Sequence, residues 1–208
     1  SIVSWTSPND SVATIAHGLG VVPTMIIMKK RGASGGWATY HQAMGNTHCM
    51  FLSTTAGKED NADVFNDTSP TSTVFTTGSD GALVNNTMIA YCFADVQGFS
   101  KMGSYIGNGN ANGPFAYLGF KPAFLLVKLA SGTDDWQILD NKRSPINIVG
   151  GYMRPNDDAS TTNNDVIDFT SNGFKLRTSA GSWNPSGGAF IYMAFAENPF
   201  VTSTGVPA

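Results

Sequence analysis

Two ten-residue stretches, GVVPTMIIMK from Gly20 to Lys29 and GFKPAFLLVK from Gly119 to Lys128, decide the fold that the sequence predicts. Each places a proline before a short apolar run, and each is followed by a turn-forming stretch rich in Gly or Ser. A short apolar run between turn signals is typical of a strand buried on both faces, because a buried helix needs at least three turns. The same pattern occurring twice indicates an internal repeat.

The repeat extends beyond these two stretches. Pro23 corresponds to Pro122, an offset of 99 residues that also relates Lys29 to Lys128, Trp37 to Trp136 and Phe75 to Phe174. The offset becomes 102 where IAYCFAD at 89–95 meets IYMAFAE at 191–197, so the second repeat has three more residues in a loop. We therefore expect internal repeats at 5–100 and 105–200 and a tail at 201–208.

The last strand of each repeat and the turn signals complete the predicted fold class. In AFIYMAFA, residues 189–196, side chains alternate between two faces that are both apolar, so this strand should be central. Stretches such as GSDG at 78–81 and GNGNANG at 107–113 supply the positive φ angles of tight hairpins. The prediction is an all-β protein, a β-sandwich of jelly-roll or lectin-like type. It should have at least about 35% strand and under about 10% helix, with at most a helical turn near 144–148.

Two arrangements of the repeats are open, namely two separate domains or a single pseudo-twofold sandwich over residues 1–208. We favour the single module, because the junction VQGFSKMGS at 96–104 is short and keeps apolar residues, whereas a linker between independent domains is usually longer and more polar. The abrupt start and open end of the chain are compatible with a fragment of a longer protein.

The composition excludes several function classes. Of the 208 residues, 41% are hydrophobic, which is enough to fill a core, but only 13% are charged, about half the usual share. With a net charge of −3 and no basic run longer than Lys29–Arg31, the surface has no positive field for nucleic acid. No apolar stretch approaches the roughly 20 residues of a membrane helix, and residues 1–5 lack the features of a signal peptide. Cys49 and Cys92 are too few for a disulfide framework, so we expect both to be reduced, with Cys92 in the core.

Several runs of the chain together carry a family resemblance. They are YCFADVQGFSKMGSYIGNG at 91–109, GPF at 113–115, GFKPA at 119–123, RSP at 143–145, SNGFKLR at 171–177 and AFAENPF at 194–200. In this order they resemble an uncharacterised domain of tail-fibre and other virion structural proteins from tailed, often marine, bacteriophages. The resemblance covers nearly the whole chain. It implies a virion location, with synthesis in the host cytoplasm, and a β-rich multimer, and it implies no catalytic residues.

The repeated tryptophans Trp37 and Trp136 are candidate ligand-binding residues. Each follows a loop rich in Gly or Ser, and alternation in WATYH places Trp37, Thr39 and His41 on one face. An exposed Trp at a loop edge can stack on a sugar ring while His and Asn side chains bond the hydroxyls. The alternative, which we favour, is that both tryptophan side chains fill the core of the sandwich, because repeated sequences preserve core packing more readily than ligand binding.

Trp183 and Asn184 are the other ligand-binding candidates. They open the loop WNPSGG at 183–188, in the part of the second repeat that is three residues longer. Insertions in loops tend to carry function. An ordinary hairpin loop is the alternative.

No metal, cofactor or catalytic site is predicted. Two acidic clusters offer oxygen ligands for calcium. Neither has the spacing of an EF-hand loop, so we expect both to be solvated loops. One cluster consists of Asp157, Asp158, Asp165 and Asp168, and the other of Glu59, Asp60, Asp63 and Asp67. The histidines His17, His41 and His48 show no zinc-ligand spacing. No nucleophile elbow and no Cys with a suitable His partner stands out. Spacing alone leaves a glycosidase carboxylate pair open.

Together with the resemblance, these features predict a non-enzymatic virion structural module of a phage tail fibre or appendage that contributes to host-receptor binding and assembly. A carbohydrate-binding domain of another context and a polysaccharide depolymerase are the alternatives. The expected partners are further copies of the chain in a homotrimer, other virion proteins and a host-surface glycan, with no nucleic acid and no membrane insertion. Apolar residues expected near the trimer axis are Phe99, Met102 and Pro199–Val201, and the alternative is that they close the monomer's own sandwich.

Overall fold

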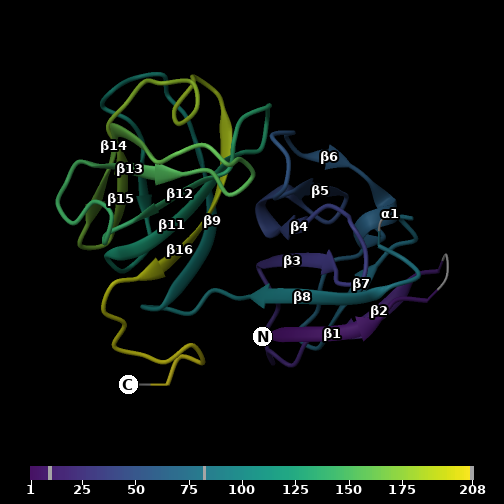
Figure 1. The fold of residues 1–208 in the computed structure, drawn as a ribbon. Helices are drawn as coiled ribbons and strands as arrows, with labels where there is room; N and C mark the ends of the chain where they lie inside the picture. Colours follow the sequence, from purple (N-terminus) through teal and green to yellow (C-terminus); the bar gives the residue numbers. More distant parts are fainter. Residues whose placement is uncertain (9–10, 82, 207–208) are drawn as a thin grey trace. The chain divides into compact units, whose positions relative to one another are not determined.

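The chain is all-β. In a computed structural model that describes residues 1–8, 11–81 and 83–206, strands account for 42% of the chain and helices for 3%, in agreement with the predicted contents. The chain divides into two compact units, Ser1–Ala94 and Asp95–Ala208 (Figure 1). That the two repeats pair into a single module stays a prediction.

The first unit is built from eight strands and two short helices in its described part. Six strands form an antiparallel sheet in the order β1 (Ile2–Thr6), β8 (Thr87–Phe93), β3 (Met25–Lys30), β4 (Ala38–His41), β5 (His48–Phe51) and β6 (Glu59–Asp60). The remaining two, β2 (Ala13–Ala16) and β7 (Val74–Thr77), pair with each other. The helices are η1 (Gln42–Met44) and α1 (Ala62–Phe65).

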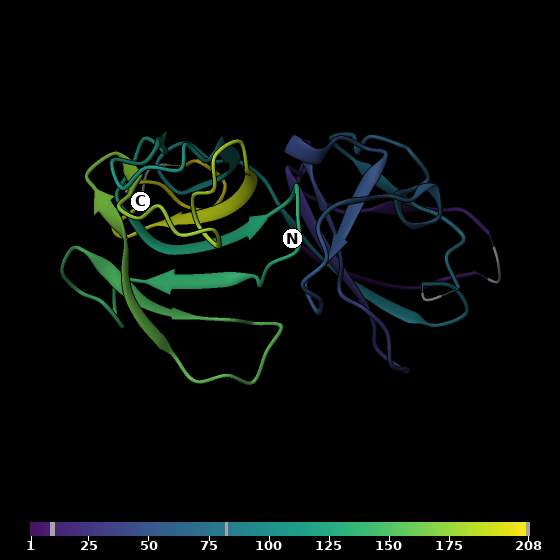
Figure 2. The same cartoon turned by 90° about the horizontal axis from the view of Figure 1, so that it is seen from above.

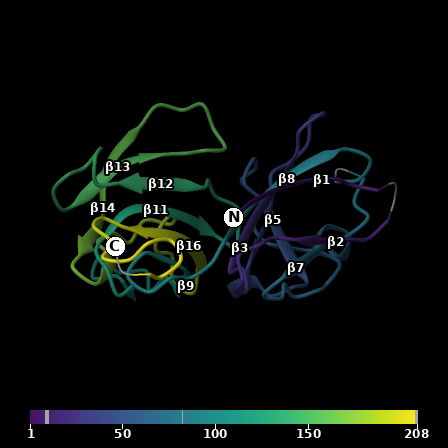
Figure 3. The same ribbon diagram turned by 90° about the horizontal axis from the view of Figure 1, so that it is seen from below.

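The second unit is a single antiparallel sheet of eight strands. Their order is β10 (Phe115–Tyr117), β15 (Gly173–Leu176), β14 (Thr162–Thr170), β13 (Val149–Met153), β12 (Gln137–Asp140), β11 (Pro122–Leu129), β16 (Ala189–Ala196) and β9 (Ser100–Ile106). Figure 3 shows β13, β12, β11 and β16 following one another across the sheet, and Figure 2 shows that the sheet is curved. Its edge strands approach each other, since Lys101 Nζ of β9 lies 5.9 Å from the ring centre of Tyr117 on β10.

The strand pairing of the second unit repeats that of the first. β3 lies between β8 and β4, and β11 lies between β16 and β12. The register matches as well, because Ile26 pairs with Cys92 and Leu125 pairs with Ala194, which are the residues related by the two sequence offsets. The repeated sequence therefore forms a repeated fold.

The two units differ where β6 and β14 end. β14 has nine residues and pairs with β15, which joins all eight strands of the second unit. β6 has two residues and is followed by α1, whose first turn is capped by the Asn61 side chain accepting a hydrogen bond from the Asp63 N–H. The Gly78 N–H, just after β7, then donates to the Val64 carbonyl at 2.9 Å, so a helix takes the place of a neighbouring strand. Residues 144–148 contain no helix, which agrees with the prediction of at most a single helical turn there.

Each unit has its own hydrophobic cluster. Residues at alternating strand positions supply both clusters, for example Ile26 and Met28 in the first unit and Leu125 and Val127 in the second. Burying one such side chain stabilises a fold by about 1.5–3 kcal/mol. Cys92 lies in the first cluster as predicted, and Cys49 is buried there too, both with free thiols. Burial raises the pKa of the Cys49 thiol to about 12 and that of Cys92 to about 11, so both stay protonated at neutral pH.

Candidate functional site

The five residues predicted to bind a ligand lie in different surroundings. Trp37 is half-buried, with its ring stacked on Tyr91 at 6.4 Å between ring centres and Lys29 Nζ 5.9 Å from the ring centre. The other four are buried, each at most 1% exposed: His41, Trp136, Trp183 and Asn184. Solvent therefore reaches the side chain of Trp37 but barely reaches those of the other four.

The buried candidates have structural contacts. His41 Nδ1 accepts a hydrogen bond from the Ala43 N–H at 3.1 Å, which caps η1. The backbone N–H of Trp136 donates to Asn156 Oδ1 at 2.8 Å. The packing alternative thus describes Trp136 well and the half-buried Trp37 only in part. Ligand binding by any of the five residues stays a prediction.

Asn184 holds three backbone segments together. Its Nδ2 donates to Asn108 Oδ1 (3.0 Å), to the Asn110 carbonyl (2.7 Å) and to the Thr178 carbonyl (2.8 Å), and its Oδ1 accepts from the Asn108 N–H at 2.7 Å. The neighbouring Trp183 accepts a hydrogen bond on its carbonyl from the Tyr105 hydroxyl at 2.9 Å. The longer loop of the second repeat is therefore tied into the unit by its first two residues.

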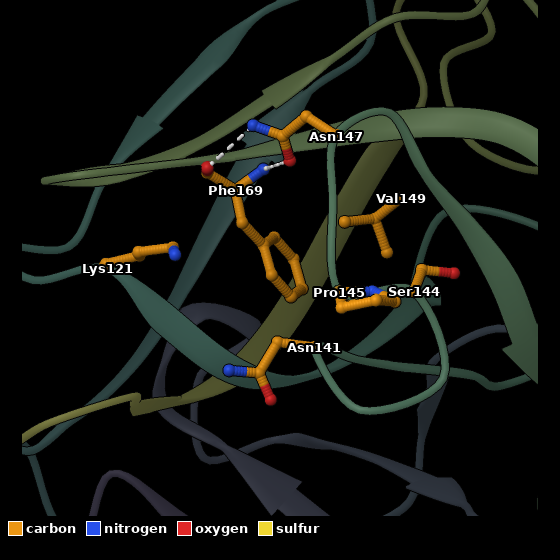
Figure 4. A pocket seen from close by; sticks show the side chains of 7 residues that line it. All are labelled: Lys121, Asn141, Ser144, Pro145, Asn147, Val149 and Phe169. Atoms are coloured by element: carbon orange, nitrogen blue, oxygen red, sulfur yellow. Dashed lines mark hydrogen bonds between the residues drawn. The ribbon is translucent and has the colours of Figure 1, made fainter.

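Two hollows in the second unit share Lys121. The larger, which we call the outer groove, has a volume of about 330 Å³ and is lined by Gly98, Gly119, Phe120, Lys121, Ser171, Ala196, Glu197, Asn198 and Phe200. The smaller, the inner pocket of about 60 Å³, is lined by Lys121, Asn141, Ser144, Pro145, Asn147, Val149 and Phe169 (Figure 4). The outer groove lies at the lower end of the size range of ligand pockets, whereas the inner pocket has room only for water or a single small group.

The sheet places an ion pair at the outer groove. Pro122 at the start of β11 is the cross-strand partner of Ala196 at the end of β16, so Lys121 and Glu197 lie opposite each other. The Glu197 N–H donates to the Lys121 carbonyl at 2.8 Å, and the side chains meet with Lys121 Nζ 2.8 Å from Glu197 Oε2. Two neighbouring strand ends therefore fix both charged groups.

Glu197 is held as an anion. Besides the contact with Lys121, its Oε1 accepts a hydrogen bond from Asn141 Nδ2 at 2.7 Å. The hydrogen bond from Lys121, helped by the one from Asn141, lowers the pKa of the Glu197 carboxyl. Each carboxylate oxygen has two acceptor positions, so both keep one for a further donor. The pair is neutral as a whole but rich in hydrogen-bonding capacity.

The inner pocket is shaped by Asn147, whose amide pairs with the backbone of Phe169 in β14. Its Nδ2 donates to the Phe169 carbonyl and its Oδ1 accepts from the Phe169 N–H, both at 2.9 Å (Figure 4). The amide therefore bonds both backbone groups of Phe169, as a neighbouring strand would. Figure 4 shows the Phe169 ring among the other lining side chains.

Aromatic side chains flank the outer groove. Phe200 lines it and is 87% exposed. Tyr117 on β10 is 61% exposed, and its hydroxyl end lies next to Gly119, where an added Cβ would come within 3.6 Å of the Tyr117 oxygen. Exposed rings of this size that adjoin a hollow are typical of surfaces that contact a ligand.

Sequence runs that are far apart along the chain meet at the two hollows. Four of the runs singled out in the sequence supply the outer groove: 91–109 with Gly98, 119–123 with Lys121, 171–177 with Ser171, and 194–200 with Glu197 and Phe200. A fifth, 143–145, supplies Ser144 and Pro145 to the inner pocket. The sequence offers these runs as motifs but gives no sign that they meet, because the meeting depends on the strand order.

Two carboxylates of the acidic cluster at 157–168 pair with arginine side chains. Asp168 pairs with Arg177 at 2.5 Å, and Asp157 lies 3.8 Å from Arg154. Across the ranges 1–8, 11–81 and 83–206, no three His, Cys, Asp or Glu side chains gather closely enough to hold a metal ion. In the same ranges no helix is long and apolar enough to cross a membrane.

The fold and the hollows define an all-β protein made of a duplicated unit, with an open groove on the second copy. The chain belongs to the family described as domain of unknown function DUF7483, whose model matches residues 1–199. The match spans both units. No curated protein and no solved structure matches the chain.

Proposed function

We propose that the chain is a non-enzymatic structural module of a virion appendage such as a bacteriophage tail fibre, which contributes to binding the host receptor and to assembly. The observation that carries the proposal is that runs resembling those of phage virion proteins meet at the outer groove. These runs supply buried residues to the hydrophobic cluster, for example Tyr105, Phe120 and Phe174, but each also places a residue at a hollow open to solvent, which folding alone does not require. A receptor-binding role accounts for that position.

The chemistry of the outer groove suits binding better than catalysis. A glycosidase needs one carboxyl group with a raised pKa to act as an acid, and a second carboxyl about 5–10 Å away. Glu197 is the acidic residue of the groove lining, and the hydrogen bond from Lys121 lowers its pKa. A carboxylate held by two donors is a fixed hydrogen-bond acceptor, which supports recognition of a polar ligand.

Binding to bacterial cells tests the receptor-binding part of the proposal. The fluorescently labelled chain should bind some strains of a broad panel, and periodate oxidation of the cell-surface glycans should abolish that binding. Release of reducing ends from the same glycans would instead show a depolymerase. A chain that binds no strain of the panel would contradict the receptor-binding role.

The proposal includes a homotrimer. Of the apolar residues expected at its axis, Met102 is 1% exposed and Phe99 packs edge-to-face on Phe195 with ring centres 6.1 Å apart. Phe200 is 87% exposed but lines the outer groove, so the neighbouring half-buried Val201 remains the candidate for a contact between copies. Light scattering should show a trimer that Val201→Ser weakens and that Phe99→Ser and Phe200→Ser leave assembled. A monomer of 22.0 kDa at high concentration would show that this chain does not trimerise by itself.

A further inference from the structure

We propose that the outer groove binds a neutral hexopyranose unit of a glycan. This inference rests on the proposed receptor-binding function and names its ligand class and its site. Three properties of the groove carry it: its size, its exposed aromatic side chains and the neutral character of its polar groups.

The size of the groove suits one or two sugar rings. Its volume of about 330 Å³ lies at the lower end of the range in which ligand pockets fall, so a long glycan would place only one or two of its sugar units in the groove at a time. The inner pocket of about 60 Å³ adds space for one substituent or a bridging water beside Lys121.

The aromatic side chains offer flat apolar surfaces. Phe200 and Tyr117, 87% and 61% exposed, leave much of their ring area in water, which is unfavourable unless a partner covers it. One face of a hexopyranose ring carries only C–H groups, and it can stack on such a ring while its hydroxyls point elsewhere. Phe120, which is 8% exposed, gives the groove an apolar base.

The polar groups of the outer groove suit the hydroxyls of a neutral sugar better than the charge of an acidic sugar. Glu197 offers acceptors, Asn198 offers a donor and an acceptor, and Lys121 offers donors, so vicinal hydroxyls can be bonded by both kinds of group. Lys121 is already neutralised by Glu197 at 2.8 Å. An acidic sugar would have to compete with that carboxylate for the ammonium group, so the groove favours neutral sugars.

The first unit lacks this chemistry. By the offset of 99 residues, Val22 takes the place of Lys121, and a valine cannot pair with a carboxylate or bond a hydroxyl. The rival aromatic residue, Trp37, is half-buried, and the ring of Tyr91 is stacked against its ring with ring centres 6.4 Å apart. The binding site is therefore specific to the second unit.

Nuclear magnetic resonance titration of the full chain tests the inference. The probes are the methyl glycosides of glucose, galactose, mannose and N-acetylglucosamine, with glucuronic acid as the anionic comparison, all in the millimolar range. We expect at least one neutral glycoside to shift the backbone amide signals of Gly98 and Gly119 and to bind more tightly than glucuronic acid. Saturation without shifts at these two amides would overturn the inference, as would tighter binding of the acid.

Side-chain variants then separate the groove from other surfaces. Phe200→Ala and Asn198→Ala, both at exposed positions, should weaken binding of the responding glycoside by about fivefold or more. Phe115→Ala, on the same face of β10 as Tyr117 but outside the groove lining, is the matched control and should bind like the unaltered chain. Loss of binding in Trp37→Ala with unchanged binding in Phe200→Ala and Asn198→Ala would place the site in the first unit.

Binding to bacterial cells tests the proposed function separately from the glycoside titration. A chain that binds bacterial cells but gives no groove response to any neutral glycoside would keep its receptor-binding role and lose the ligand class proposed for the groove. A chain that binds neither cells nor glycosides would lose both.

Discussion

Replacing Asn184 by Ala distinguishes a structural residue from a ligand-binding one. The change removes the partner of three backbone groups, the Asn108 N–H and the carbonyls of Asn110 and Thr178. Leaving a buried polar group unpaired costs about 1–3 kcal/mol, and these loops border solvent that can re-pair some of the groups, so the lower end of that range applies to each. We expect the second unit to lose about 3 kcal/mol of its free energy of unfolding.

Hydrogen exchange followed by mass spectrometry measures the loss of stability within the second unit itself. Amides in peptides from β9 and β16 should exchange about 100-fold faster in Asn184→Ala than in the unaltered chain, because each 1.4 kcal/mol is a factor of ten in an opening equilibrium. Asn163→Ala, an exposed asparagine of β14, is the matched control and should change exchange little. Exchange in Asn184→Ala equal to that of the control would refute the structural role and strengthen the prediction that Asn184 binds a ligand.

Two further changes test the packing of the second unit. Lys128 is 1% exposed and burial lowers its pKa from 10.5 to about 8, so the unfolded chain binds more protons between these values and stability should rise with pH through this window. In urea unfolding, the stability of Lys128→Met relative to the unaltered chain should therefore fall between pH 8 and pH 10.5, whatever the constant cost of losing the hydrogen bonds from Lys128 Nζ to the carbonyls of Leu129 and Gly132. A relative stability that does not change with pH would contradict the cause given. A Cβ added to Gly173 would lie 2.1 Å from the carbonyl oxygen of Ala116, so Gly173→Ala should lower the melting temperature by several degrees. The control is Gly181→Ala, whose added Cβ has no atom within 4 Å and should leave the melting temperature unchanged. Equal melting temperatures for the two variants would disprove the close approach of β10 to β15.

The strands were predictable where the sequence repeats. The apolar runs after Pro23 and Pro122 mark β3 and β11, and the two offsets reproduce the pairing of Ile26 with Cys92 and of Leu125 with Ala194. Helix α1 was not predictable, because four residues show no helical period and only its Asn61 cap marks its start. The missing pairing of β6 with β7 depends on that helix, so it could not be foreseen either.

The candidate site was less predictable than the fold. Duplication drew attention to Trp37 and Trp136, yet one is half-buried and the other buried, because the loops around equivalent positions differ between the repeats. Glu197 and Lys121 are 76 residues apart in sequence and become neighbours only because β11 and β16 pair. The signal that could have found them was the pair of runs 119–123 and 194–200, which flank those strands.

A glycan array with the labelled full chain and its Phe200→Ala variant tests the central proposal, a binding module that recognises neutral sugars through the outer groove. We expect the unaltered chain to bind a restricted set of bacterial surface glycans that share a neutral hexose, and the variant to lose most of that signal. Phe115→Ala should retain it. Binding of the unaltered chain and Phe200→Ala to the same glycans with equal strength, or a preference for acidic glycans, would contradict the proposal.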